Sequence, residues 1–442
     1  MSRRLLLLLL SAAGLALLQQ QWLLRRPPRL LTLQSQPIHS GSTALDLRFS
    51  RPMDRASFAA ASTLMPALQH RWQGQNDALR LQIDARQAIG QPLQLQFSGT
   101  DQRGQMFPLQ RWWWDPRPWL VVNRVLEGGE QLQLQRRDGS WLPLTPVWPA
   151  INQVEPISDG RGVAIVSSDG SGQERIWIRR LQPRNLQRQQ RDQAPPRLGP
   201  LQSLITRQLL FGHISSNLNG DLLMQTGGFA AGSETVELML ASGARQHLGL
   251  AASGPMQLLP AGGGVVVPST NGLTIKALST DNNPPQGQLL PGRRELGAFC
   301  PASGRAVLIR HWPDYRRSIE LVVPGVAPRE LHLGDEAVLA VACNNTGTRI
   351  WAVLGRWTAN RSHQTIVLMD DAGTVMQRRR LDPWLIQPGT RLSLDSVGQQ
   401  LLLTVGKAPQ RQSGVAALMH AESLAWIKIG DLRIKEALWL QS

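Results

Sequence analysis

The sequence predicts an all-β protein with three parts: an N-terminal hydrophobic leader or anchor, a small β-sandwich, and a β-propeller of about seven blades. Three observations support this. A charge-free apolar run opens the chain, apolar and polar residues then alternate, and a strand unit that follows a glycine turn recurs to the end. The expected boundaries are 1–24 for the leader, 25–40 for a linker, 41–114 for the sandwich and 119–442 for the propeller.

The composition narrows the class of protein. A chain of 442 residues is long enough for two or three domains. A hydrophobic content of 42% excludes a polytopic membrane protein and argues against disorder. Two cysteines exclude a multi-cysteine zinc cluster or a disulfide framework. The formal net charge of +16 comes almost entirely from arginine.

The N-terminus predicts export. Arg3 and Arg4 precede Leu5–Leu18, a run without charge, which is the pattern of a secretory signal. The run is shorter than the ~20 apolar residues that cross a bilayer, unless it extends to Leu24 through three glutamines. Both a cleaved signal and an uncleaved membrane anchor therefore stay open, and we favour the anchor, with location in the periplasm or cell envelope.

The first domain is predicted from alternating strands. Residues 45–49, 79–83 and 93–97 each place apolar side chains at every second position. Such strands have one face on a core and one in water. Several short strands separated by turn residues, within about eighty residues, predict a β-sandwich.

This segment resembles a known family. The stretch Leu47–Asp54, followed by Pro66, Trp72 and the turn Thr100–Gly104, is similar to the bacterial Ig-like domain of the S-layer (SbsA) type. The resemblance covers residues 36–114. It implies an Ig-like sandwich that serves as a non-catalytic spacer or adhesive module.

A repeated unit predicts the second domain. In its clearest copy, Gly160 precedes an apolar strand at 163–166, and a second strand follows at 175–178. The turn glycines of all copies stand at 160, 220, 263, 304, 347 and 398, which are 41 to 60 residues apart. Periods of this size with several strands per unit are typical of propeller blades.

A weaker unit at 120–144 brings the count to seven, with six or eight blades, or a solenoid or sandwich array, as alternatives. A last strand at Glu436–Leu440 is expected to pair into the first blade and close the ring. The copy Ser158–Arg161 resembles the blade motif of TolB-type and other WD40-like propellers. A basic Gln/Pro-rich insertion at 182–200 lengthens one unit.

No catalytic motif, metal-ligand spacing or cofactor fingerprint occurs, so we expect no enzyme activity, no metal and no cofactor. A propeller can assemble a site from separate blades, and His213, His311, His363 and Asp159 are the candidates for such a site. Surface or loop-capping roles are favoured for them. Asp54 and Asp101 are read as turn caps in preference to a calcium pair.

Cys300 and Cys343 hold equivalent places in neighbouring units, each four residues before its turn glycine. Export would permit a disulfide between them if their Cα atoms lie within about 7 Å. Two small buried thiols are the favoured alternative.

Tryptophans concentrate where the two predicted domains meet. Trp112, Trp113, Trp114 and Trp119 bracket this junction, and we expect them to join the sandwich to the propeller. A sugar-binding platform or a membrane-interface site is the alternative.

Arginines gather in and beside the insertion. They are interpreted either as contacts for an anionic partner or, equally favoured, as a solvated charged face. The members of this run are Arg179, Arg180, Arg184, Arg188, Arg191 and Arg197. Export points to anionic envelope partners, namely polysaccharide, lipid or acidic protein surfaces, and argues against nucleic acid.

The sequence therefore predicts a non-enzymatic binding or scaffolding protein of the cell envelope, with a hydrolase or lyase of glycan or peptide as the alternative.

Overall fold

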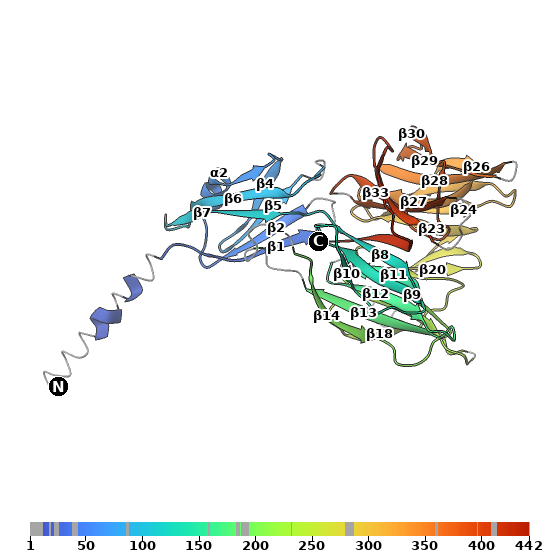
Figure 1. The fold of residues 1–442 in the computed structure, drawn as a ribbon, viewed down its shortest axis with the longest axis horizontal. Coiled ribbons are helices and arrows are strands. Elements are labelled where there is room, and N and C mark those ends of the chain that lie inside the picture. The colour runs from blue at the N-terminus through green and yellow to red at the C-terminus, as the bar shows by residue number, and fades with distance from the viewer. Residues whose placement is uncertain are drawn as a thin grey trace.

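The computed structural model describes residues 12–16, 19–21, 26–37, 43–84, 88–157, 160–182, 186, 194–230, 232–278, 287–358, 361–395, 397–407 and 413–441. They form two β domains (Figure 1). The predicted leader lies largely outside these residues, and its described parts, 12–16 and 19–21, are helical. Within the described ranges, no helix combines the length and the apolar character needed to cross a membrane.

The first domain is a sandwich of two sheets around one core. One sheet has the order β1-β2-β5-β4, and its strands are Leu30–Pro37, Thr43–Phe49, Ala78–Ile83 and His70–Gln75. The other has the order β3-β6-β7, and its strands are Thr63–Met65, Leu93–Thr100 and Met106–Trp114. The helix α2, Arg55–Ala61, lies between β2 and β3 in the chain. The three strands expected from the alternation are β2, β5 and β6.

The predicted linker 25–40 is wrong in part, because it contains β1. This strand pairs antiparallel with β2, and Leu30 and Leu33 are buried in the sandwich core. The pairing shifts register between Leu30 and Thr32, and therefore both leucines face the core although they are three residues apart in the sequence. A search for a period of two does not detect such an irregular strand.

The second domain contains seven antiparallel sheets within the described residues, the number that the repeat predicts. Blade 1 has β8 (Trp119–Leu126), β9 (Gly129–Gln135), β10 (Trp141–Pro143) and β36 (Ile434–Leu440). Blade 2 has β11 (Ala150–Ile157), β12 (Gly162–Ser168), β13 (Glu174–Gln182) and β14 (Arg197–Ser203). Blade 3 has β15 (Phe211–Ser216), β16 (Leu222–Gly227), β17 (Thr235–Met239) and β18 (Arg245–Leu248).

Blade 4 has β19 (Gln257–Leu258), β20 (Gly264–Ser269), β21 (Gly272–Ala277) and β22 (Gly287–Pro291). Blade 5 has β23 (Arg294–Cys300), β24 (Arg305–His311), β25 (Arg317–Val322) and β26 (Arg329–Gly334). Blade 6 has β27 (Ala337–Cys343), β28 (Arg349–Thr358), β29 (Arg361–Asp370) and β30 (Val375–Arg380). Blade 7 has β31 (Trp384–Ile386), β32 (Ser393–Asp395), β33 (Gln400–Lys407), β34 (Val415–His420) and β35 (Trp426–Ile429).

The ring closes as predicted. The C-terminal strand β36 pairs with β8, with Leu438 opposite Val121, and so joins the end of the chain to the first blade. Outside its own sheet, β36 contacts β33, β34 and β32 of blade 7 and β11 of blade 2. In the last unit of the repeat, the apolar residues at 424–427 predict the second strand, but in the structure β34 is the partner of β33, and β35 is the outer strand of blade 7.

The two faces of the ring differ in what they meet. The first turns of neighbouring blades touch one another, since Leu218 N–H donates to Pro260 O at 2.9 Å and Ala302 N–H to Asn345 O at 2.8 Å. The first turn of blade 7 reaches the sandwich, where Ile89 N–H donates to Val397 O at 2.8 Å. We call this the sandwich-side face, and the opposite face, where second and third strands are joined, the hairpin face.

Candidate functional site

The junction between the domains combines a charged network with apolar contacts, since Leu186 and Val397 of the propeller are buried in the sandwich core. Asp115, which is buried, accepts hydrogen bonds from Arg117 Nε at 2.8 Å and Nη2 at 2.7 Å, and lies 3.2 Å from Arg137 Nε. Arg117 Nη1 also donates to Gly90 O of the sandwich at 2.8 Å. The guanidinium of Arg137 lies 4.1 Å over the Trp119 ring. These contacts fix the sandwich against blades 1 and 7.

The tryptophans predicted to join the domains are placed differently. Trp112 and Trp114 are buried inside the sandwich core, and Trp119 is buried in the propeller. Trp113 is 38% exposed. The expectation is corrected because alternation along β7 turns Trp112 and Trp114 inward and Trp113 outward. Each domain buries its own indoles, and the arginine–aspartate network joins the two domains together with Leu186 and Val397.

Asp395 adds a titratable group to this junction. It is buried in blade 7, accepts the N–H of Val397 at 2.9 Å, and lies in the field of Arg117 and Arg137. Burial raises its pKa from 3.8 to about 6, while backbone hydrogen bonds and the two arginines act in the opposite direction. This carboxyl group therefore changes charge near pH 6.

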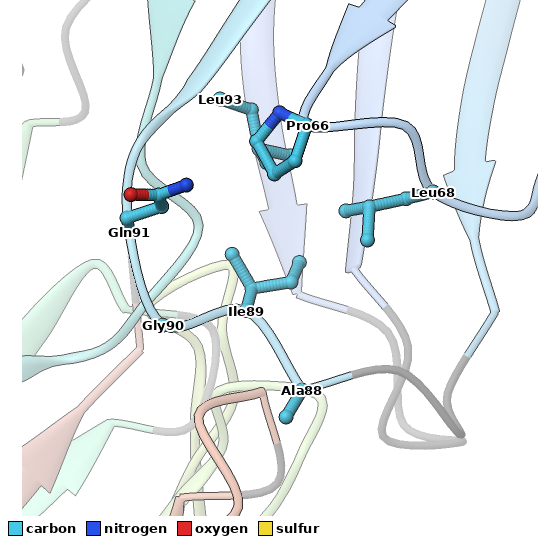
Figure 2. A pocket seen from close by; sticks show the side chains of 7 residues that line it. All are labelled: Pro66, Leu68, Ala88, Ile89, Gly90, Gln91 and Leu93. Atoms are coloured by element: carbon cyan, nitrogen blue, oxygen red, sulfur yellow. The ribbon is translucent and has the colours of Figure 1, made fainter.

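A cavity of about 300 Å³ lies at the end of the sandwich beside the junction (Figure 2). Its lining consists of Pro66, Leu68, Ala88, Ile89, Gly90, Gln91 and Leu93. Among these only Gln91 has a polar side chain, so the cavity suits a small apolar group. Because Ile89 and Gly90 bond to the propeller, its shape depends on the junction.

The two cysteines are brought together. Cys300 and Cys343 end the innermost strands β23 and β27, with Cα atoms 5.5 Å apart, and form a disulfide. The bond joins the first turns of blades 5 and 6 on the sandwich-side face. Two equivalent positions in adjacent blades meet because innermost strands converge around the ring axis.

The arginine run does not form one surface within the described residues. Arg179 donates to Leu144 O at 2.6 Å and to Gly199 O at 2.8 Å, and burial lowers its pKa. Its expected role as a surface contact is therefore corrected to an internal one. Arg180 is half-buried and Arg197 is exposed. Arg184, Arg188 and Arg191 lie outside the described residues.

The histidines considered for a composite site each have a separate partner. His213 lies 3.1 Å from Gln153 Oε1, His311 lies 3.0 Å from Glu295, and His363 lies 3.1 Å from an Arg380 nitrogen. They belong to blades 3, 5 and 6, and Asp159 is outside the described residues. The described chain contains no group of three His, Cys, Asp or Glu side chains that could hold a metal.

The two aspartates read as turn caps do bond the backbone. Asp54 accepts the N–H groups of Ala56 at 2.9 Å and Ser57 at 3.3 Å at the start of α2. Asp101 accepts those of Arg103 at 2.9 Å and Gln105 at 2.7 Å. Both side chains are therefore engaged in local structure.

A charged cluster that the sequence did not reveal lies where blades 7, 1 and 2 converge. Arg391, between β31 and β32, bonds Glu155 of β11 at 2.7 Å and lies 3.8 Å from Glu436 of β36. Burial raises the pKa of Glu436, and the Glu155 charge adds to that effect. The three residues are up to 281 positions apart in the chain, so only ring closure brings them together.

The hairpin face presents exposed aromatic side chains. Phe229, Tyr315 and Trp357 are 63%, 87% and 70% exposed, and each stands near the link between the second and third strands of its blade. The three blades are 3, 5 and 6. Because the three occupy equivalent places on one face of the ring, this face is a candidate interaction surface.

Basic side chains concentrate around one of these aromatics. We define the blade 6 patch as Arg356, Trp357, His363, Arg378, Arg379 and Arg380. Strand pairing sets Arg356 opposite His363, which in turn lies 3.1 Å from Arg380. Two carboxylates neutralise part of the charge: Glu336 lies 3.5 Å from Arg356, and Asp382 lies 2.9 Å from Arg380.

Comparisons with known proteins do not assign a family, because no family model and no curated protein matches the chain. Solved structures with low similarity include TolB from Acinetobacter baumannii, at 12% identity and a TM-score of 0.40, covering 87% of this chain and 84% of that one. The β-propeller domain of the Trilobed protease from Pyrococcus furiosus has 9% identity and a TM-score of 0.44, covering 79% and 92%. A quinonprotein alcohol dehydrogenase-like protein from Bacteroides thetaiotaomicron has 8% identity and a TM-score of 0.43, covering 86% and 92%.

We therefore define the protein by its own strand pairing, as a β-sandwich joined to a closed seven-bladed β-propeller.

Proposed function

We propose that the chain is a non-enzymatic binding or scaffolding protein of the cell envelope, in which the propeller presents the interaction surface. The observation that supports this most directly is the set of exposed aromatics Phe229, Tyr315 and Trp357 on the hairpin face. The junction fixes the sandwich to the opposite face, so a partner has free access to the aromatics.

In this proposal the sandwich is the spacer. The support is its resemblance to Ig-like S-layer modules together with the predicted leader, which would put the sandwich between a membrane tether and the propeller. The buried Asp115–Arg117–Arg137 network holds the two domains in one orientation, which suits a scaffold that presents a surface at a fixed distance.

Two measurements test the proposal. Cell fractionation with sequencing of the mature N-terminus is expected to place the chain in the envelope; an intact chain in the cytoplasm contradicts it. A photo-crosslinking residue in place of Tyr315 is expected to capture an envelope component in living cells. The matched position is Met106, which is 68% exposed on the sandwich and should not capture it.

One observation favours a second candidate, an envelope hydrolase or lyase. Glu155 and Glu436 flank Arg391, the pKa of Glu436 is raised by burial, and a carboxyl group with a raised pKa next to a second carboxyl group is a common acid–base arrangement. Turnover of a glycan or peptide that Glu436→Gln abolishes, with the fold intact, would establish this candidate. Unchanged turnover would leave the cluster as a bridge between blades.

A further inference from the structure

The blade 6 patch has the features of a site for an extended anionic polymer. β28 and β29 are ten residues each, and no other described strand exceeds nine. This long hairpin carries Trp357 near its end, with Arg356 beside it. The arginines of β30 lie at the same face, because β30 leads through 381–383 directly into β31.

Two arginines of the patch have free guanidinium groups. All six residues of β30 are exposed, and no described residue forms an ion pair or a side-chain hydrogen bond with Arg378 or Arg379. Strand pairing places Arg378 opposite Val367 and Arg379 opposite Ile366, so the two side chains point to opposite sides of the sheet. A guanidinium offers a planar fork of donors that matches a carboxylate or a sulfate.

We propose that the blade 6 patch binds an acidic polysaccharide that runs from the end of the β28–β29 hairpin along the outer strand β30, with Trp357 stacking on a sugar ring and Arg378 and Arg379, on either side of that edge strand, bonding its charged groups. This deepens the proposed binding function and rests on it. The aromatic face supplies apolar contact while the arginines supply charge.

The charge pattern favours this polymer over other polyanions. Glu336 and Asp382 stand within the patch and leave it with a modest positive charge. A nucleic acid strand carries a phosphate at every nucleotide, and an anionic membrane presents a dense charged plane, so both would meet these carboxylates. A polysaccharide with spaced charges can place them against the arginines alone.

The test measures binding of the full-length protein to polygalacturonate, with neutral dextran as the uncharged control. Trp357→Ala is expected to weaken binding about fivefold, the scale of one aromatic contact. The double variant Arg378→Gln/Arg379→Gln is expected to weaken it about tenfold and to reduce its salt dependence. Matched controls lie on the sandwich: Trp113→Ala, at an aromatic side chain that is 38% exposed, and Arg55→Gln, at an exposed arginine; both should stay within about twofold of wild type.

Three results would overturn the proposal: no binding to polygalacturonate, equal losses in the controls, or tighter binding to oligothymidylate or phosphatidylglycerol vesicles that the same variants abolish. The Tyr315 crosslink separates this failure from failure of the proposed function. A protein captured there without polygalacturonate binding refutes the polysaccharide and keeps the scaffold. The absence of both refutes the two together.

Discussion

The sandwich buries its apolar residues in one cluster, which also takes in Leu186 and Val397 of the propeller. The described core of the propeller divides instead into seven smaller clusters, one at each contact between neighbouring blades. Four of the seven phenylalanines of the chain lie in the sandwich cluster. One of them, Phe58, contacts four other aromatic rings. The propeller clusters consist mainly of Leu, Ile, Val and Met.

This difference determines how much of a domain a single core substitution destabilises. A cavity in the sandwich weakens the only core that holds its two sheets together. A cavity in the propeller weakens one blade contact out of seven, while the ring stays closed through β36 and the disulfide. We expect two unfolding transitions that single substitutions can separate.

The largest effect is expected from Phe58→Ala. The Phe58 ring is fully buried and lies 5.0 Å from the Trp72 ring and 5.2 Å from the Phe49 ring. Its removal should lower the free energy of unfolding of the sandwich by about 3–5 kcal/mol. Differential scanning calorimetry should show the sandwich transition shifted and the propeller transition in place. Met106→Ala, at an exposed position, is the control. A joint shift of both transitions would contradict the conclusion that the sandwich and the propeller unfold separately.

Removing the disulfide tests how much it contributes to the stability of the propeller ring. The double variant Cys300→Ser/Cys343→Ser should destabilise the propeller by about 2–4 kcal/mol under oxidising conditions and leave the sandwich transition unchanged. With a reductant present, wild type and variant should melt together. An equal loss under reducing conditions would mean that packing of the two side chains, and not the bond, supports this contact.

The junction is expected to respond to pH through Asp395. Its folded pKa of about 6 exceeds its ordinary 3.8, so the folded state binds this proton more tightly than the unfolded state. The contribution to stability is complete below pH 4 and is lost as pH rises through 6, by up to about 3 kcal/mol. Asp395→Asn should remove this loss, so the variant should be the more stable protein at pH 8.

Urea unfolding of both proteins at pH 4.5 and pH 8 measures this difference. Asp314→Asn is the opposite control, because Arg316 lowers the pKa of the exposed Asp314 carboxyl group. A stability gap between wild type and Asp395→Asn that is the same at both pH values would contradict the assignment.

The smallest effect belongs to the sandwich. Asp54→Ala removes the cap of α2 and should cost about 1 kcal/mol of sandwich stability. Asp54→Asn keeps an acceptor for the Ala56 N–H and should retain most of it. Added calcium should leave the melting temperature of the wild type unchanged, and a calcium-dependent rise would revive the metal interpretation of Asp54 and Asp101.

The local sequence pattern was sufficient to predict a residue's structural role wherever that role depends on its neighbours in the chain. The alternation at 45–49 predicted β2, and the spacing of the turn glycines predicted the blades, because left-handed turns such as the one at Gly160 (φ +73°) recur where each first strand ends. Equivalent positions within the repeat also identified Cys300 and Cys343 as a candidate pair. The irregular strand β1 and the displaced β34 escaped detection because neither keeps the period.

The sequence by itself therefore determined the β architecture, and it predicted about seven blades and the closing strand, since strand period and turn chemistry are local properties. Only the tertiary structure decided which residues share a site. It joined Arg391 to Glu155 and Glu436, bonded Arg179 to two carbonyl groups, and set Arg356 opposite His363 in blade 6. Ring closure and domain docking set these contacts, and they depend on distances in space that no spacing along the chain encodes.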